Sequence, residues 1–200
     1  MNNTPNIIEI GASPILDVIQ TKSWTKLFDG KAPKWGLGMY WKDWINLKTE
    51  FDVVIISMGS KNNDSEISLG GFMINPHESP IWNSCVSIPS FILNGLLDAK
   101  DASSKMLIVY LDSLSSVSYK SFIDDPVEYS VAKSAMGTFL KGLSNLHDNV
   151  KVVDIMLNED ISNEDELAIR ILGNISDAYE YFDDMKSFES YVVETGNELN

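Results

Sequence analysis

A tyrosine and a lysine stand four residues apart, at Tyr129 and Lys133, in a stretch whose apolar pattern predicts a long helix over residues 127–146. Residues four apart share one face of a helix, so both side chains can project from the same turn. A nearby ammonium favours phenolate over phenol, which lowers the tyrosine pKa and makes the tyrosine usable as a general acid or base near neutral pH. The spacing alone proves little, because a helical tyrosine is usually a half-buried packing residue.

The elements that would carry this pair alternate regularly along the chain. Short apolar runs are separated by helical stretches, as in a parallel sheet that is covered on both faces. The predicted strands span residues 6–11, 51–59, 105–113, 149–157 and 190–195. The predicted helices span residues 13–28, 87–100, 127–146 and 163–188, the last with a break near Gly173. The sequence therefore predicts an α/β fold with a doubly wound, Rossmann-like parallel sheet, in a single domain over residues 1–200.

Two segments between these elements lack a clear period. Residues 31–50 are rich in Trp and Gly, and residues 60–84 are rich in turn-forming residues. We interpret residues 60–84 as a long loop. Long loops in compact domains tend to be functional or mobile, so this one is a candidate to line or cover a pocket.

The charge of the chain limits its partners. The formal net charge is -14, and Arg170 is the single arginine, so we expect no nucleic-acid and no membrane partner. Cys85 is the single cysteine, which excludes an internal disulfide, and no Cys or His cluster indicates a metal site. The chain has no apolar run long enough to span a bilayer and its start is unlike a signal peptide. We therefore expect a soluble, cytoplasmic protein.

Three of these segments together resemble a known family. They are KMLIVYLDS at 105–113, YSVAKSAMGTFLKGLSNL at 129–146 and VKVVDI at 150–155, and they are similar to the central and later parts of the short-chain dehydrogenase/reductase family. FDVVIISMG at 51–59 and YVVETG at 191–196 extend the resemblance over most of the chain from residue 51 onward. Its most specific element is the Tyr-x-x-x-Lys helix that follows a strand ending in serine.

The resemblance implies a role for each matching residue. Tyr129 would donate or accept the proton at the substrate oxygen, Lys133 would lower its pKa and hold the nicotinamide ribose, and a serine would fix the substrate. Ser113 ends the strand as the family's serine does, while Ser116 has the more usual distance to the tyrosine; we favour Ser113 because loops absorb insertions. The family's catalytic asparagine would fall near Asn83, which we otherwise interpret as an exposed loop or cap residue.

The sequence departs from the family most where the nucleotide would bind. Of the glycines in the family's nucleotide loop only Gly11 remains, the sole candidate cofactor-binding residue, and Ile15 and Asp17 occupy the next two glycine positions. A branched side chain and a carboxylate there oppose the approach of a pyrophosphate. The family's Asn-Ala-Gly and Pro-Gly are also replaced, at residues 57–59 and 157–158. The interval between the first two predicted strands is too short for two complete βα units, so we expect a reduced N-terminal half.

Three hypotheses about function follow from the retained pair and the altered loop. The first is a pseudoenzyme that transfers no hydride, binds no cofactor and acts as an assembly subunit. The second is a cofactor-independent enzyme in which Tyr129 and Lys133 perform acid-base chemistry on a small carbonyl substrate. The third is an NAD(P)-dependent carbonyl oxidoreductase of the ketoacyl-reductase type with an unusual loop.

The partner in the first hypothesis would bind the helix at residues 127–146. The resemblance implies that this helix forms a dimer interface, with a second copy or with a related reductase. One apolar stripe along it comprises Val131, Ala135, Phe139 and Leu143, and a second comprises Ala132, Met136 and Leu140. The two stripes make a face wide enough for a homodimer or heteromer contact, although burial between the sheet and the loops would produce the same pattern.

Overall fold

The protein is described from a computed structural model. The structure describes residues 5–11, 24–26, 51–57, 79–99, 104–113, 127–157 and 164–193. Within these ranges no helix combines the length and the apolar character needed to cross a membrane.

A parallel sheet forms the centre of the described structure. Its strands are β1 (Ile7–Ile10), β2 (Trp24–Lys26), β3 (Val53–Ile56), β4 (Met106–Ser113), β5 (Val150–Leu157) and β6 (Phe188–Val193). They lie in the order β2-β1-β3-β4-β5-β6, and every neighbouring pair is parallel. The chain passes from β1 outward to β2 and then returns to the other side of β1 as β3. The strand order therefore reverses between β1 and β3, the place where ligands bind in sheets of this kind.

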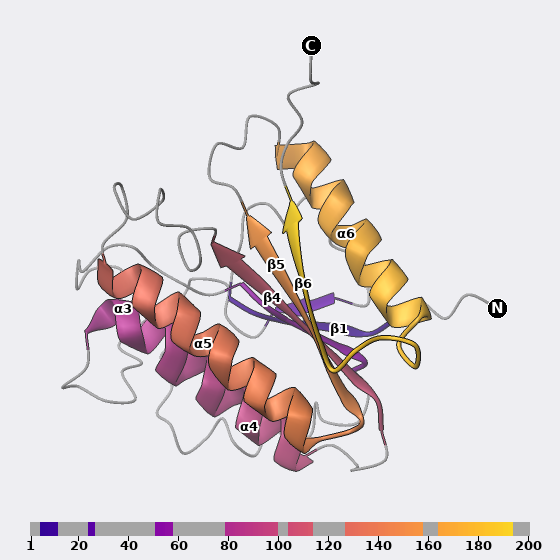
Figure 1. Cartoon of the computed structure of the whole chain (residues 1–200), viewed down its shortest axis with the longest axis horizontal. Helices are drawn as coiled ribbons and strands as arrows, with labels where there is room; N and C mark the ends of the chain where they lie inside the picture. Colours follow the sequence, from indigo (N-terminus) through magenta and orange to yellow (C-terminus); the bar gives the residue numbers. More distant parts are fainter. Residues whose placement is uncertain are drawn as a thin grey trace.

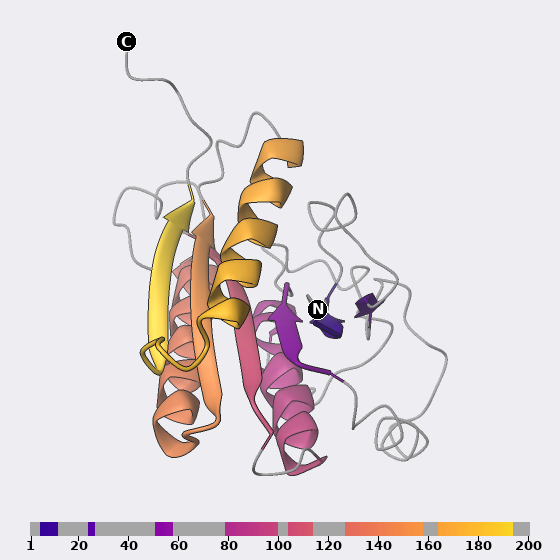
Figure 2. The ribbon, with the colours of Figure 1, turned by 90° about the vertical axis from the view of Figure 1, so that its right-hand side faces the viewer.

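Helices cover both faces of this sheet (Figures 1 and 2). One face carries α3 (Pro80–Trp82), the π-helical turn η1 (Asn83–Ser87), α4 (Ile88–Ala99) and α5 (Val127–Leu146), and the other carries α6 (Glu164–Glu180). Successive residues of each strand point to opposite faces of the sheet. Ile108 and Val152 pack in the apolar cluster with α4 and α5. Val109 and Val153 pack in the apolar cluster with α6. The predicted doubly wound, Rossmann-like α/β fold is thereby confirmed.

Three predicted elements differ from the observed ones. Residues 24–26 lie in a strand, not in the predicted helix over 13–28, because they pair with β1. The remainder of that helix, and the predicted loop over residues 60–78, lie outside the described residues. Residues 80–84 are helical, because Ser79 caps α3 by accepting a hydrogen bond from the backbone N–H of Trp82.

The third difference concerns α6, which continues through Gly173 without the predicted break and ends at Glu180. A glycine inside a helix costs about 1 kcal/mol relative to alanine. Ile171 and Ile175 on either side are fully buried against the sheet, and their burial offsets this cost. The chain then turns and enters β6 at Phe188.

Candidate functional site

The first two turns of α5 bring Tyr129 and Lys133 together under the sheet. Both side chains are buried, with exposed fractions of 7% and 3%. The Lys133 ammonium lies 5.9 Å from the centroid of the Tyr129 ring, so the two groups share one face of the helix. The arrangement can support the phenolate of Tyr129 by charge. The catalytic roles of the two residues stay a prediction.

The burial of Lys133 depends on contacts with strand β4. Its Nζ donates a hydrogen bond to the carbonyl oxygen of Leu111 at 2.9 Å and lies 4.8 Å from the centroid of the Tyr110 ring. The Tyr110 hydroxyl in turn donates to the carbonyl oxygen of Lys133 at 3.2 Å. A buried charge is tolerated only when it is hydrogen-bonded or compensated, and these contacts supply part of that compensation.

Ser113 is the last residue of β4 and is buried, as a strand-end serine should be. Its backbone N–H donates to Asp112 Oδ1 at 2.7 Å. By strand alternation Ser113 shares a face with Leu111, which packs in the cluster on the α6 side, whereas Asp112 follows Tyr110 on the α5 side. The proposed role of Ser113 beside Tyr129 stays a prediction, and the alternative, Ser116, lies outside the described residues.

Asn83 is a cap residue, one of the two environments predicted for it, but it is buried. It is 2% exposed, so it is not an exposed loop residue. It is the C-cap of α3 and the first residue of the π-helical turn, and its Nδ2 donates to the carbonyl oxygen of Ser79 at 3.2 Å. Asn83 is buried because a helix begins at Pro80, which the turn-rich sequence did not indicate. The turn packs against α5, with Cys85 and Tyr129 in one apolar cluster.

The carboxyl ends of β1 and β3 lie where the resemblance would place a nucleotide. Gly11 has φ 126°, a conformation that favours glycine over residues with a side chain. Its role in binding a cofactor stays a prediction. The backbone N–H of Ser57 donates to the carbonyl oxygen of Ile10 at 2.9 Å and ties the two strand ends together. Ile15 and Asp17 lie outside the described residues.

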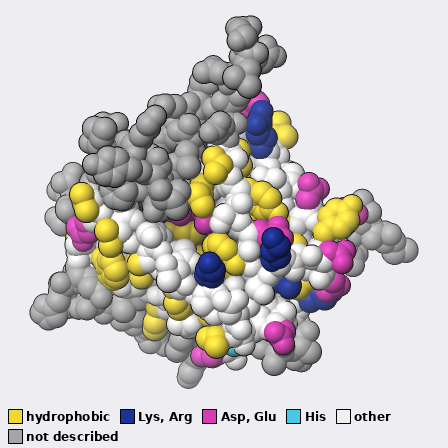
Figure 3. Space-filling view, in the orientation of Figure 1, with side chains coloured by type: hydrophobic (Ala, Val, Ile, Leu, Met, Phe, Trp, Pro, Cys, Tyr) yellow, Lys and Arg dark blue, Asp and Glu magenta, His cyan; other side chains and the backbone are white. Residues whose placement is uncertain are grey.

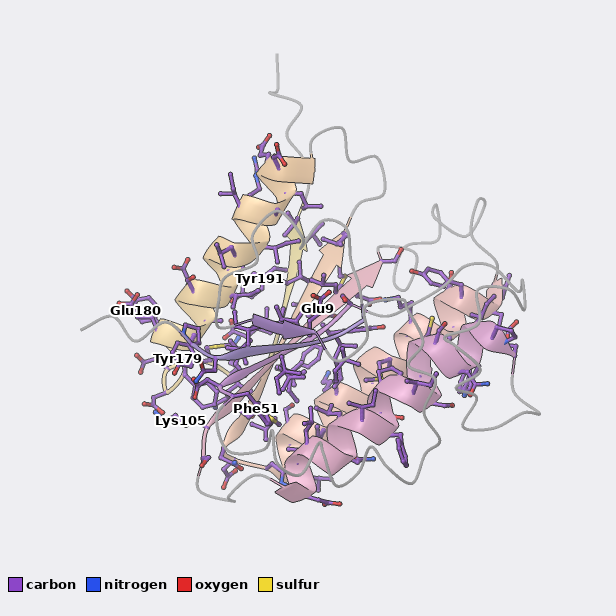
Figure 4. The ribbon with its side chains drawn as sticks, turned by 180° about the vertical axis from the view of Figure 1, so that it is seen from behind. Glu9, Phe51, Lys105, Tyr179, Glu180 and Tyr191 are labelled. Carbon is purple, nitrogen blue, oxygen red and sulfur yellow. The ribbon has the colours of Figure 1, made fainter. Side chains whose placement is uncertain are left out.

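A buried acid beside Gly11 was missed by the sequence reasoning. Glu9, labelled in Figure 4, lies on strand β1 with no exposed surface. Ser57 Oγ donates a hydrogen bond to its Oε1 at 2.6 Å. The signal was an acidic residue inside the apolar run NIIEIG. A carboxyl group two residues before the turn adds no hydrogen-bond donor for a pyrophosphate when it is ionised. Gly11 and Lys133 are the described residues that the resemblance would assign to a dinucleotide.

A second buried acid, Asp154, lies near the Tyr-Lys pair. It is 4% exposed, and Ser190 Oγ donates to its Oδ2 at 3.3 Å. Among the described residues its Oδ1 has no hydrogen-bond partner. Burial raises its pKa to about 7, with a further rise from the charge of Asp112, while the Ser190 hydrogen bond and the Lys133 ammonium act in the opposite direction.

The pKa of Tyr110, the register partner of Asp154 on β4, is also shifted. Burial first, and then the charge of Asp112, raise the pKa of Tyr110 well above its usual value. Tyr110 therefore stays protonated and acts as a hydrogen-bond donor to α5. Three charged side chains, those of Lys133, Asp112 and Asp154, thus surround the neutral Tyr110 on the face of the sheet that α5 covers.

A separate pocket of about 320 Å³ lies between the end of α6 and β6. Tyr181, Asp177 and Glu189 are among its lining residues, and Tyr191, labelled in Figure 4, donates a hydrogen bond to Glu189. This hydrogen bond raises the pKa of Tyr191 to about 12 and lowers that of Glu189. None of the residues proposed for chemistry lines this pocket.

Comparisons with known proteins identify the fold. No protein-family model and no curated protein matches the chain. An oxidoreductase of the short-chain dehydrogenase/reductase family from Brucella ovis, in complex with a partially ordered NAD, aligns with a TM-score of 0.61 at 10% identity, over 96% of this chain and 100% of that chain. A short-chain dehydrogenase/reductase from Vibrio parahaemolyticus aligns with a TM-score of 0.59 at 12% identity, over 94% and 99% of the two chains.

A mutant of a short-chain dehydrogenase/reductase from Serratia marcescens gives a TM-score of 0.60 at 12% identity, over 94% of each chain. At these identities the likeness concerns the fold. The chain has the fold of the short-chain dehydrogenases/reductases, and the resemblance inferred from its sequence is confirmed at that level.

Proposed function

We propose that this chain is a short-chain dehydrogenase/reductase-like subunit that does not transfer hydride and that functions in an assembly. The observation that carries the proposal is the position of the Lys133 ammonium. In the family that the chain resembles, this lysine holds the nicotinamide ribose. Here its side chain is almost fully buried and donates to the carbonyl oxygen of Leu111, so very little of its surface is open to a ribose.

The nucleotide end of the sheet supports the same proposal. Glu9 is buried two residues before Gly11 and is hydrogen-bonded by Ser57, where the family has the asparagine of Asn-Ala-Gly. The sequence adds Ile15 and Asp17 at two positions where glycines normally allow backbone N–H groups to approach the pyrophosphate. We infer that no dinucleotide binds there in the family's manner.

The surface of α5 supports assembly over a smaller area than the sequence indicated. Ala132, Met136 and Leu140 are fully buried in the chain's own core, so this stripe is not available to a partner. Val127 and Val131 remain exposed, and Figure 3 shows apolar side chains gathered over this part of the molecule. We propose that this end of α5 contacts a second copy of the chain or a related reductase.

A second candidate function keeps the acid-base chemistry without a cofactor. The proximity of the Lys133 ammonium to the Tyr129 ring favours it, because such a charge supports a phenolate near neutral pH. Tyr129 would then move a proton to or from a small carbonyl substrate, with Lys133 as its pKa modifier. NAD(P)-dependent carbonyl reduction is equally consistent with the fold, and the Brucella ovis protein is described with NAD.

Calorimetric titration with NADPH and NADH, each up to the millimolar range, tests the proposal. We expect no heat of binding from the wild-type chain. Micromolar binding that is lost in Lys133→Met, but kept in Lys141→Met on the exposed side of the same helix, would overturn the proposal in favour of the reductase. If no binding occurs, assays of proton exchange on small ketones with Tyr129→Phe as control separate the two remaining functions.

A further inference from the structure

Four buried side chains among the described residues belong to Asp, Glu or Lys. They are Glu9, Asp112, Asp154 and Lys133. By strand alternation, Asp112 and Asp154 lie on the face of the sheet that α5 covers, and Lys133 reaches the same face from α5. Asp154 is the buried charged residue of the mostly apolar strand β5; it lies outside the Tyr-x-x-x-Lys motif and has no role in the resemblance.

The geometry places Asp154 one strand away from the Lys133 ammonium. Asp154 and Tyr110 are register partners on β5 and β4, and adjacent strands are separated by about 4.8 Å. The Lys133 ammonium lies 4.8 Å from the centroid of the Tyr110 ring. The two residues therefore flank the same tyrosine, in a region where charges interact strongly because little water separates them.

The contacts of Asp154 leave part of its carboxyl group unsatisfied. Oδ2 accepts a hydrogen bond from Ser190, its register partner on β6. Oδ1 is buried and has no partner among the described residues. A buried carboxylate with one oxygen unsatisfied is costly, whereas the protonated acid carries no charge, so the site favours the protonated form and the pKa of Asp154 is raised.

We propose that Asp154 is a positioning residue that controls the net charge around Lys133 and thereby the acidity of Tyr129. When Asp154 releases its proton to solvent, its negative charge opposes the Lys133 ammonium and the Tyr129 phenol holds its proton more tightly. When Asp154 is protonated, the ammonium acts on Tyr129 with less opposition. The use of this effect in catalysis rests on the second candidate function, but the coupling itself requires no substrate.

Several groups face Asp154 from the packed elements. They are Tyr110 and Asp112 on β4, Lys133 on α5 and Ser190 on β6. Tyr129 of α5 and Cys85 of η1 act on Tyr110, the register partner of Asp154. The pKa of about 7 for Asp154 places its titration near neutral pH, mainly because of its burial. The charge of Asp112 raises the pKa of Asp154 further, and the Lys133 ammonium lowers it, so both charges act on the titration of Asp154.

The test is a measurement of the ionisation of Tyr129 by the ultraviolet absorbance of the phenolate, taken as the difference between each protein and its Tyr129→Phe counterpart. In Asp154→Asn, which keeps an acceptor for Ser190, we expect the Tyr129 midpoint to fall by about one pH unit. Asp183 is an exposed acid that is paired with Lys105 at the surface, so Asp183→Asn should leave the Tyr129 midpoint unchanged. Equal midpoints in Asp154→Asn and the wild type would overturn the proposal.

A second measurement applies if Asp154→Asn does not fold. In the wild-type chain, carbon-detected NMR of labelled Asp and Tyr follows the Asp154 carboxyl and the Tyr129 ring carbon through the same pH range. We expect the Tyr129 signal to show a step at the Asp154 midpoint, and in Ser190→Ala we expect both steps to move to higher pH, because the carboxylate loses its donor. A Tyr129 signal with no step at that midpoint contradicts the coupling, whatever the result of the NADPH titration.

Discussion

Lys133 of α5 donates a hydrogen bond from Nζ to the carbonyl oxygen of Leu111 in β4, at 2.9 Å, so the cation of the Tyr-Lys pair is bound to the sheet itself. The same β4 segment supplies Tyr110, whose hydroxyl donates back to the Lys133 carbonyl oxygen. The start of α5 is thus held to β4 by hydrogen bonds in both directions. Lys133 therefore holds α5 against the sheet, in addition to being a candidate for acid-base chemistry.

Replacing Lys133 by methionine should destabilise the protein by about 3 kcal/mol at pH 8, because Asp112 and Asp154 lose a buried counter-charge. The loss should be smaller at pH 5, where Asp154 is protonated. Urea unfolding at the two pH values measures the difference. Lys141→Met, at an exposed position on the same helix, should change the free energy of unfolding by less than about 0.5 kcal/mol. A loss of the same size at both pH values would show that the acids do not depend on Lys133.

The raised pKa of Asp154 makes a separate prediction for the pH dependence of stability. In the unfolded chain its pKa is about 3.9, and in the folded protein it is about 7, so between these values the folded state binds more protons and its stability falls as the pH rises. Asp154→Asn removes this contribution. From pH 4 to pH 8, the stability of the variant relative to wild type should rise by as much as about 4 kcal/mol.

Denaturant unfolding of both proteins at several pH values provides the measurement. Asp183→Asn serves as the control, because its side chain is largely exposed and paired with Lys105 at the surface. Parallel stability curves for Asp154→Asn and wild type would mean that Asp154 ionises at an ordinary pH in the folded protein.

The sequence predicted those parts of the fold that depend on local pattern. Strand β4 and helix α5 were placed within a residue of their observed bounds, because one is a continuous apolar run and the other a long periodic stretch. Strand β2 was missed, because its three residues form a strand only through pairing with β1. The pairing of Tyr129 with Lys133 followed from helical spacing, whereas the surroundings of Glu9 and Asp154 depend on neighbouring strands far apart in the sequence.

Two glycines with opposite requirements offer a test of the backbone at the candidate nucleotide turn. Gly11 has φ 126°, where an alanine would be strained, so Gly11→Ala should lower the free energy of unfolding by more than about 1 kcal/mol. Gly173 lies inside α6, where an added Cβ would meet no atom within 4 Å, so Gly173→Ala should raise the free energy of unfolding by about 1 kcal/mol. Thermal unfolding of the two variants measures both effects. A neutral Gly11→Ala would mean that the turn after β1 tolerates an ordinary backbone conformation.

The exposed end of α5 gives the last prediction, which concerns assembly. Val131 is 51% exposed, and a second copy of the chain placed on it would bury an apolar surface that the fold leaves open. Val131→Asp should therefore convert a dimer into a monomer in sedimentation velocity, without lowering the free energy of unfolding of the monomer, because the side chain makes no part of the buried core. Ile169→Asp, at an exposed apolar position on α6 on the opposite face of the sheet, is the matched control and should remain dimeric. A wild-type chain that sediments as a monomer at high concentration would rule out the homodimer, and the heteromer would then be tested by binding to a related reductase.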